Sequence, residues 1–296
     1  MNGMKIGVVG AGTMGSGIAQ VTAFHGHQVC LQDVSEDSLE RAMTRVRRSL
    51  RKVVDKQEET DPEELFQATL HRIHATTDQG ALAETEFVIE AVFESFEVKK
   101  SVLRALDRIC GPGTILASNT SSISITRLAA ATERAEKTVG MHFMNPVPVM
   151  RLVEVIRGLS TSDETCEKAK ILAQQLGKVA VEVRDFPGFV SNRVLLPMLN
   201  EAIFAVMEGV AEPESIDQVM RLGMNHPMGP LQLADFIGLD VCLDILKVLY
   251  EGFKDPKYRP CPLLQQMVDA GRLGRKSGRG FYPYGATSHP KTFTEL

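Results

Sequence analysis

A histidine and a glutamate near the middle of the chain have the residue types that acid–base chemistry needs. His142 ends the predicted strand 139–142, and Glu154 interrupts the apolar run 152–156. A buried carboxylate without a partner is energetically costly, and an imidazole is a suitable partner for it. If the two side chains meet, Glu154 would hold the ring of His142 in one tautomer, and His142 would take the proton of an alcohol as a general base.

Each of these residues also has an ordinary structural explanation. A histidine is more often a satisfied core or surface residue than a base. Strand alternation would point Glu154 to solvent, while Val153 and Val155 point inward. No group of cysteine and histidine residues has the spacing of metal ligands, so a zinc-dependent oxidation is disfavoured. The sequence motifs around His142 and Glu154 are therefore needed to distinguish a catalytic pair from two structural residues.

Two further polar segments follow predicted strands in the same half of the chain. One holds Glu94 and Lys99, and the other is the polar run 118–122, which includes Ser121. In open parallel sheets a ligand binds outside the carboxyl ends of the strands. We therefore expect these two segments and the segment 142–146 to converge on one site.

A glycine-rich segment near the N-terminus has the spacing GxGxxG. It follows the predicted strand 5–9 and opens a predicted helix, and it consists of Gly10, Gly12 and Gly15 with Thr13 and Met14 between the last two. Gly10 permits a tight turn, Gly12 lets the backbone approach a pyrophosphate, and Gly15 lets helix and strand pack closely. The unpaired N–H groups of the helix N-terminus favour an anion. The segment predicts a dinucleotide site.

Asp33 ends the second predicted strand, roughly 20 residues beyond the glycines. A carboxylate at this point can accept hydrogen bonds from ribose hydroxyls, and its charge would repel a 2′-phosphate. The alternative is a helix-capping aspartate before Ser35 and Glu36. We predict NAD rather than NADP as the cofactor.

The segment 39–54 predicts an amphipathic helix with a strongly basic surface. Apolar residues mark one face, and basic residues crowd the others, among them Arg41, Arg45, Arg48, Arg51 and Lys52. Such a patch could bind the phosphates of a ligand, although composition alone favours an ordinary solvated surface. RNA or a membrane is disfavoured as a partner because no aromatic residues are interleaved.

The organisation of the chain predicts an α/β domain followed by an all-helical domain. Up to about residue 184 helical patterns alternate with short strands, as in a Rossmann-type, doubly wound, mostly parallel sheet. We expect these strands at 5–9, 28–32, 87–92, 114–117, 139–142, 152–156 and 178–183.

The second part of the chain is predicted to be helical. Beyond a Pro-Gly pair at 187–188 we expect helices at 194–206, 216–222, 231–250 and 263–270. Two domains follow, 1–184 and 185–296. Asn192 opens the second, either as a helix cap or as a donor to a substrate oxygen.

Composition narrows the class of protein. The 296 residues carry a formal net charge of −4, which gives no overall reason to bind nucleic acid or an anionic membrane. The five cysteines are scattered without CxxC pairing, which fits a reducing compartment. The apolar run 6–9 begins too early for a signal peptide, and no apolar stretch approaches the ~20 residues that cross a bilayer. We expect a cytoplasmic protein.

Five blocks of sequence, in order, resemble the L-3-hydroxyacyl-CoA dehydrogenases, including the bacterial 3-hydroxybutyryl-CoA dehydrogenases. Within residues 5–282 they are the glycine motif with Asp33 and the segments 118–122, 142–148, 185–193 and 226–230. The resemblance implies a reversible, NAD-dependent oxidation of a short (S)-3-hydroxyacyl-CoA thioester to the 3-oxoacyl-CoA. It also implies a homodimer formed through the helical domain.

The resemblance further implies a role for each candidate residue. His142 and Glu154 form the catalytic pair, with Ser121 and Asn192 near the oxygens of the substrate. The cofactor is contacted by the glycine motif with Thr13 and Met14 and by Asp33, Glu94, Lys99, Ser121, Asn145 and Lys276, with Asn145 near the nicotinamide. Coenzyme A lies beside Ser49 and Lys56, so the basic helix gains an anionic ligand. The segment 55–59 around Lys56 is acidic, which suits a phosphate less well.

Two alternatives to this function stay open. One is a dehydrogenase of a free hydroxy acid, because related α/β proteins with helical C-terminal domains carry the same glycine motif. The other is a non-catalytic protein that binds NAD with the same fold. The presence of both His142 and Glu154 argues against it, because a site without turnover has no chemical need for the two residues.

Overall fold

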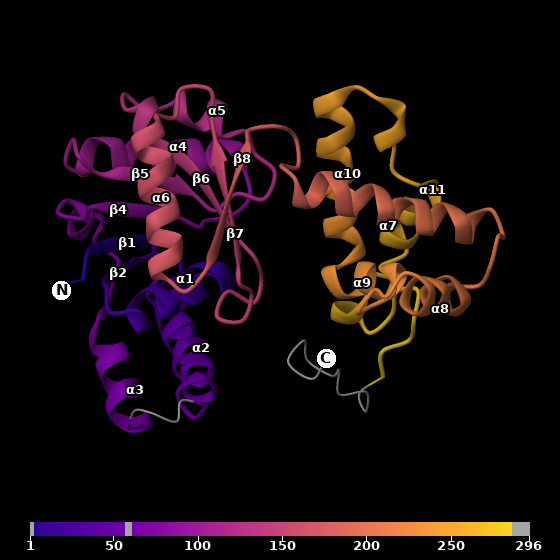
Figure 1. Cartoon of the computed structure of the whole chain (residues 1–296), viewed down its shortest axis with the longest axis horizontal. Coiled ribbons are helices and arrows are strands. Elements are labelled where there is room, and N and C mark those ends of the chain that lie inside the picture. Colours follow the sequence, from indigo (N-terminus) through magenta and orange to yellow (C-terminus); the bar gives the residue numbers. More distant parts are fainter. Residues whose placement is uncertain (1–2, 57–60, 286–296) are drawn as a thin grey trace. The chain divides into compact units, whose positions relative to one another are not determined.

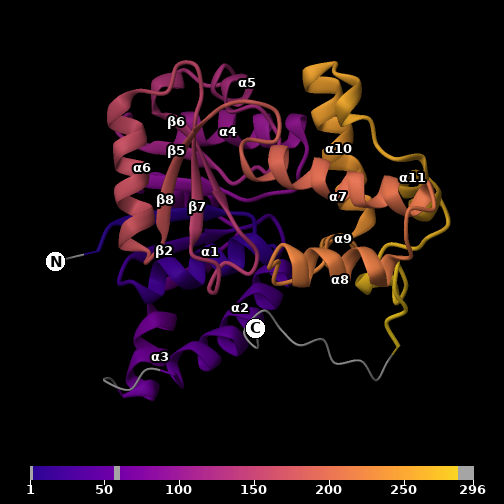
Figure 2. The ribbon, with the colours of Figure 1, turned by 45° about the vertical axis from the view of Figure 1, so that its right-hand side comes forward.

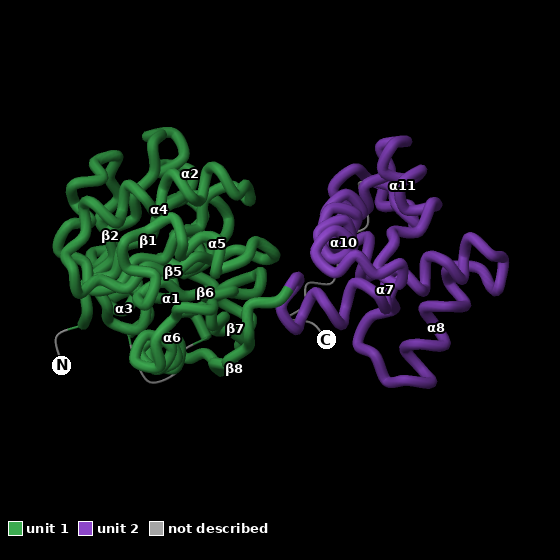
Figure 3. Tube along the Cα trace, turned by 90° about the horizontal axis from the view of Figure 1, so that it is seen from above, with its two compact units in different colours: residues 1–186 green, residues 187–296 purple. Residues whose placement is uncertain are grey.

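The computed structural model describes residues 3–56 and 61–285. The chain divides into two compact units, Met1–Phe186 (unit 1) and Pro187–Leu296 (unit 2), shown in green and purple in Figure 3. A mostly parallel sheet with helices forms unit 1, and helices form unit 2, which confirms the predicted fold class. The boundary between the units lies at 186–187, close to the predicted end of the first domain at residue 184.

Unit 1 is built on an eight-stranded sheet with the strand order β3-β2-β1-β4-β5-β6-β7-β8 (Figure 1). Its strands are β1 (Lys5–Val9), β2 (Gln28–Gln32), β3 (Ile73–Thr76), β4 (Phe87–Glu90), β5 (Ile115–Ser118), β6 (Thr138–Phe143), β7 (Leu152–Arg157) and β8 (Val179–Arg184). Strands β6 and β7 pair antiparallel, and the other neighbours pair in parallel. The first six strands follow the order of dinucleotide-binding sheets, in which the ligand crevice opens where the order reverses. Here the reversal lies between β1 and β4.

Helices cover both faces of this sheet (Figures 1 and 2). They are α1 (Thr13–Phe24), α2 (Glu36–Val54), α3 (Pro62–His71), α4 (Phe96–Ile109), α5 (Ile125–Ala129) and α6 (Asp163–Gln175), with short 3₁₀ turns at Gln79–Leu82 and Ala135–Lys137. Phe87 and Ile89 of β4 belong to the apolar core that α1 and α6 share with the sheet, and Val88 between them is equally buried. Successive side chains of a strand point to opposite faces. Both faces are therefore apolar, and the strands read as continuous apolar runs.

The basic helix α2 has well-formed ends. The side chain of Ser35 accepts a hydrogen bond from the backbone N–H of Ser38 at the N-terminus. Acidic residues lie in the first turn and basic residues, Arg51 and Lys52, in the last. Negative charges near the N-terminus and positive charges near the C-terminus interact favourably with the helix dipole, so this distribution stabilises α2.

Unit 2 consists of helices around a separate apolar core. The helices are α7 (Ser191–Met207), α8 (Pro213–Gly223), α9 (Pro230–Ile237), α10 (Leu239–Phe253) and α11 (Pro262–Asp269), with 3₁₀ turns at Pro256–Tyr258 and Arg275–Ser277. Asp235 is 1% exposed and accepts hydrogen bonds from the backbone N–H groups of Phe281 and Tyr282, both at 3.0 Å. These bonds hold the segment after the last 3₁₀ turn against α9.

Three details of the predicted elements were wrong. Helix α3 and strand β3 were not predicted, although Asp61 is a typical N-cap whose side chain accepts from Glu63 N at 2.8 Å. Strand β3 lies at the sheet edge and buries only Ile73 fully, so it has little apolar periodicity. The predicted helix 231–250 is two helices, because Gly238 adopts φ +106° between them.

None of the helices within 3–56 and 61–285 combines the length and the apolar character that a membrane span requires.

Candidate active site

The antiparallel pairing of β6 with β7 brings the predicted catalytic pair together. His142 lies directly opposite Glu154 in the register, where side chains point to the same face. Nδ1 of His142 lies 2.9 Å from Oε2 of Glu154, and the two residues are 6% and 2% exposed. The alternative that Glu154 points to solvent is therefore wrong. Strand β7 lies between two other strands and its four central residues are buried, so alternation does not lead to solvent here.

The contact between His142 and Glu154 determines which ring nitrogen of the imidazole carries the proton. A neutral imidazole has one nitrogen that donates and one that accepts, and a carboxylate can only accept. Contact with Glu154 therefore places the proton on Nδ1 of His142 and the lone pair on Nε2. A carboxylate in this position also stabilises the imidazolium that forms when Nε2 takes up a proton, and burial strengthens that interaction.

Asn119 fixes the end of the strand that carries His142. Its side-chain Oδ1 accepts from the backbone N–H of Phe143 at 2.9 Å. Its backbone N–H donates to the carbonyl oxygen of Glu90 at 2.7 Å. The residue is 7% exposed. These contacts join the carboxyl ends of β4, β5 and β6. Asn119 belongs to the polar run 118–122 that was expected at the site, but no individual role was predicted for it from the sequence.

Glu94 and Ser121, which follow different strands, meet as predicted from the sheet order. Oε1 of Glu94 accepts from the backbone N–H of Ser121 at 2.9 Å and from Oγ1 of Thr120 at 2.5 Å. Lys99 is 1% exposed, and its Nζ lies 3.3 Å from Oε2 of Glu94 and 2.7 Å from Oε1 of Glu90. Sequence reasoning missed Glu90. The signal was the same as for Glu154, a carboxylate within an apolar run.

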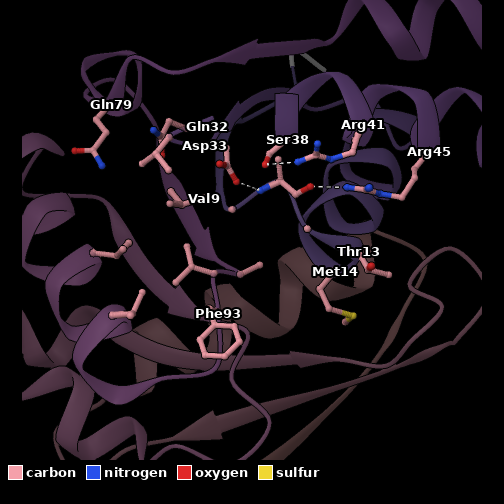
Figure 4. Close-up of a pocket in the computed structure, with 18 residues that line it drawn as sticks. Val9, Thr13, Met14, Gln32, Asp33, Ser38, Arg41, Arg45, Gln79 and Phe93 are labelled. Atoms are coloured by element: carbon pink, nitrogen blue, oxygen red, sulfur yellow. Dashed lines mark hydrogen bonds between the residues drawn. The ribbon is translucent and has the colours of Figure 1, made fainter. Parts of the chain in front are cut away.

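A cavity of about 640 Å³ opens at the reversal of the strand order (Figure 4). Gly10, Gly12, Thr13, Met14 and Asp33 line it together with Arg41 and Arg45 of α2. Oδ2 of Asp33 accepts from Ala11 N at 2.7 Å, and Oδ1 accepts from Ser35 N at 3.1 Å. The N-cap of α2 is Ser35, so Asp33 is not a helix cap.

The three glycines of the motif differ in what surrounds them. A Cβ on Gly10, at φ +101°, would lie 2.7 Å from the carbonyl oxygen of Ala91, and one on Gly15 would lie 1.8 Å from that of Gly10. A Cβ on Gly12 would meet no protein atom within 4 Å. Gly10 and Gly15 are therefore required by the fold, whereas the space at Gly12 suits a pyrophosphate in front of the N-terminus of α1. The residues present fit a dinucleotide.

A second cavity, of about 370 Å³, shares Thr13 and Arg45 with the first. Helix α2 contributes Arg45, Arg48, Ser49 and Lys52 to it, and the loop after β6 contributes residues 145–148, so Ser49 and Asn145 share this cavity. Lys56 is exposed beyond the end of α2 and does not belong to the lining. Arg45 lines both cavities, and its guanidinium donates to the carbonyl oxygen of Ala11 at 2.6 Å.

Lys178 supports the loop that carries Asn145. Its Nζ donates to the carbonyl oxygens of Val147 and Met150 at 2.6 and 2.9 Å. Burial lowers the pKa of Lys178. The two carbonyl groups therefore compensate a desolvated ammonium and fix the wall of the second cavity.

Two candidates belong to unit 2. Asn192 lies in the first turn of α7 and is 9% exposed, and the N-cap of that helix is Val190, so the capping explanation is wrong. Nζ of Lys276 lies 2.5 Å from Oδ2 of Asp240. The contacts predicted for Asn192 with the substrate and for Lys276 with the cofactor stay predictions.

The strand order, the glycine motif and Asp33 define unit 1 as a dinucleotide-binding domain of the dehydrogenase class. Residues 5–186 match the NAD binding domain of 3-hydroxyacyl-CoA dehydrogenase, and residues 188–284 match the C-terminal domain of the same family. The chain belongs to the 3-hydroxyacyl-CoA dehydrogenase family, whose members are NAD-dependent oxidoreductases. This confirms the resemblance seen in the sequence and NAD as the cofactor.

Individual relatives agree with this assignment over nearly the whole chain. A probable 3-hydroxybutyryl-CoA dehydrogenase of Bacillus subtilis is 56% identical over 95% of this chain and 97% of its own length. The 3-hydroxybutyryl-CoA dehydrogenase of Bradyrhizobium diazoefficiens is 53% identical over 95% of both chains. The crystal structure of (S)-3-hydroxybutyryl-CoA dehydrogenase from Ralstonia eutropha is 51% identical, with a TM-score of 0.92 over 95% of this chain and 99% of that chain.

Gly12→Ala tests where the cofactor phosphates lie. The backbone of Gly12 is extended at φ −70°, so alanine fits, and the free energy of unfolding should change by no more than about 1 kcal/mol. The added methyl group would occupy the space of the pyrophosphate, and the dissociation constant of NADH should rise about tenfold or more. NADH fluorescence titration and urea unfolding measure the two effects.

Gly113→Ala is the matched control, because a Cβ there also meets no atom within 4 Å. It should leave NADH affinity unchanged. Parent-like NADH affinity in Gly12→Ala would contradict the placement of the cofactor.

Proposed function

We propose that this chain oxidises the 3-hydroxyl group of short (S)-3-hydroxyacyl-CoA thioesters, such as 3-hydroxybutyryl-CoA, to the 3-oxoacyl-CoA. The observation that carries the proposal is the buried contact between His142 and Glu154, 2.9 Å long, at the edge of the sheet where the dinucleotide cavity opens. NAD supplies the hydride acceptor. The names of the relatives from three bacterial genera support the choice of substrate.

In the proposed reaction His142 takes the proton of the substrate hydroxyl on Nε2. The C3–H bond gives up its electron pair and proton together as a hydride, and the C3–O bond becomes a carbonyl. Glu154 keeps the imidazole ring in place and stabilises the imidazolium. Ser121 and Asn192 hydrogen-bond the oxygens of the substrate. In the reverse direction the imidazolium of His142 returns the proton to the oxygen of the ketone.

The coenzyme A portion of the substrate is proposed to bind along α2. The second cavity has Arg48 and Lys52 beside Ser49, and guanidinium and ammonium groups suit phosphates. A free hydroxy acid would leave these charges without a ligand, so the cavity favours a thioester of coenzyme A. We place the coenzyme on Arg48, Ser49 and Lys52 and assign Lys56 a smaller part, since it lies outside the lining.

We also propose that the protein is a cytoplasmic homodimer that associates through unit 2. Helix α8 and the residues that follow it expose large apolar side chains, with Val219 61%, Leu222 74% and Met224 62% exposed. Contiguous apolar side chains on a surface favour association. The scattered free cysteines fit a reducing compartment.

Replacing His142 or Glu154 tests the proposed chemistry. His142→Ala should lower kcat for 3-hydroxybutyryl-CoA by roughly 10²–10⁴-fold, the usual contribution of a positioned base. Glu154→Gln should lower kcat by about 10²-fold, at the lower end of that range, because the base remains but the amide cannot stabilise the imidazolium. Formation of NADH, followed by absorbance, gives both rates.

His74→Ala, in the edge strand β3, is the control and should behave as the parent does. A rate within a few-fold of the parent for His142→Ala would rule out the proposed role of this histidine.

Replacing the basic residues of the second cavity tests the coenzyme A site. Arg48→Met and Lys52→Met should each raise KM for 3-hydroxybutyryl-CoA by about tenfold, since charge-assisted hydrogen bonds contribute about 1.5–3 kcal/mol. Because these contacts are remote from C3, kcat should not change. Initial rates over a range of thioester concentrations separate the two parameters.

Arg47→Met, on the same helix but outside the cavity lining, is the matched control. The increases in KM should disappear with a truncated N-acetylcysteamine thioester. Equal increases with the truncated substrate would show that the cavity does not bind coenzyme A.

The proposed dimer predicts a particle of twice the 32.5 kDa chain mass in light scattering after size exclusion. Leu222→Glu should shift this mass to that of the monomer, because a carboxylate in an apolar interface is costly. Leu159→Glu, at an apolar residue of unit 1 that is 87% exposed, should leave the dimer intact. A monomeric parent at micromolar concentration would refute the dimer.

A further inference from the structure

Glu90 and Lys99 form an ion pair that the proposed chemistry does not use. Their side chains are 0% and 1% exposed, and Oε1 of Glu90 lies 2.7 Å from Nζ of Lys99. A buried ion pair is seldom more stabilising than an apolar pair of the same size, because both charges lose their water. A different benefit has to explain its presence next to the candidate active site, and the partners of the two residues indicate one.

Three oxygen atoms of unit 1 lie close to the Lys99 ammonium. They are Oε1 of Glu90 at 2.7 Å, the carbonyl oxygen of Val92 at 3.2 Å and Oε2 of Glu94 at 3.3 Å. Lys99 therefore hydrogen-bonds Glu90 and the backbone of Val92, and it forms an ion pair with Glu94.

Glu90 joins the ends of two strands through its carboxylate. Oε1 accepts from the backbone N–H of Val92 at 2.7 Å as well as from Lys99, and Oε2 accepts from Oγ of Ser118 at 2.6 Å. Ser118 is the last residue of β5. The ion pair therefore lies at the carboxyl ends of β4 and β5. The loops that carry Glu94 and Ser121 begin there.

Glu94 is the link between this pair and the loop after β5. Its side chain is 40% exposed, so without Lys99 it could rotate into solvent and gain conformational entropy. While Oε2 is held by Lys99, Oε1 accepts from the backbone N–H of Ser121 at 2.9 Å and from Oγ1 of Thr120 at 2.5 Å. The contacts run from Glu90 through Lys99 and Glu94 to Ser121.

We propose that Glu90 and Lys99 are positioning residues, whose buried ion pair fixes the Glu94 carboxylate so that it holds the loop 120–122 in the geometry that turnover needs. Lys99 then acts on the loop through Glu94. The effect on turnover rests on the function proposed above, in which Ser121 contacts the substrate. The effect on the loop does not depend on that function.

A double-mutant cycle tests whether Lys99 acts through Glu94. Lys99→Met and Glu94→Gln should each lower kcat/KM for 3-hydroxybutyryl-CoA by roughly tenfold to a hundredfold, and the double variant should be no slower than the slower single variant. Losses that multiply would overturn the proposal, because they would show that Lys99 acts independently. Lys100→Met, at the neighbouring lysine of α4, which pairs with Glu97, is the control and should match the parent.

Lys99→Met leaves the buried carboxylate of Glu90 without its partner, which can prevent folding. The charge-balanced variant Glu90→Gln/Lys99→Met removes both charges and keeps the test available. It should fold as the parent does, yet lower kcat/KM by the same factor that is predicted for Lys99→Met. Parent-like kcat/KM in the charge-balanced variant would refute a positioning role for the pair.

Hydrogen exchange measured by mass spectrometry gives a readout that does not need turnover. Exchange in the segment 119–123 should become about tenfold faster or more in the charge-balanced variant, in which Glu94 is no longer held, and in Glu94→Ala, in which the Ser121 amide loses its acceptor, while exchange in β1 stays unchanged. Unchanged exchange at 119–123 would overturn the proposal. If the parent turns over no thioester, the proposed function fails, and the exchange experiment still decides the role of the pair.

Discussion

The hydrogen bond between Nδ1 of His142 and the carboxylate of Glu154 is the interaction on which the proposed chemistry depends. It exists because β7 runs antiparallel to β6 in a sheet that is otherwise parallel. The antiparallel register places the two residues directly opposite each other, within reach of a short contact. A slip of one residue would turn Glu154 to the other face of the sheet, and the histidine would lose its orientation.

The surrounding polar residues show how the edge of the sheet forms a site. Asn119 and Glu90 satisfy buried polar groups at the carboxyl ends of neighbouring strands, and Glu94 does so for the loop after β5. Buried polar groups are stabilising only when they are paired, so these contacts define one conformation of the loops. At the next strands along the sheet, Gly10, Gly12 and Asp33 line the cavity that fits a dinucleotide. The proposed cofactor site and the proposed base thus lie at the same edge of one sheet.

Much of this arrangement could be predicted from the sequence. Strands with continuous apolar runs, the glycine motif and the interruption of 152–156 by Glu154 each follow from a local pattern. The edge strand β3 was missed because an edge needs few apolar residues, and the break of 231–250 at Gly238 was missed because apolar periodicity continues across it. The partners of Lys99 could not be predicted from spacing, because Glu90 and Glu94 lie near it only once β4 and α4 are folded. The second cavity likewise depends on how α2 packs beside the loop at 145–148.

The most direct test of the central claim is the tautomer of His142 in the resting protein. Nitrogen-15 spectra of histidine-labelled protein report which ring nitrogen carries the proton, and a His142→Gln sample identifies the signals among the seven histidines. We predict that the neutral ring carries its proton on Nδ1 and none on Nε2, and that this preference weakens in Glu154→Gln, whose amide can either accept from or donate to Nδ1. A His142 ring protonated on Nε2 alone would contradict this prediction, because the carboxylate of Glu154 would then face a nitrogen that has no proton to donate.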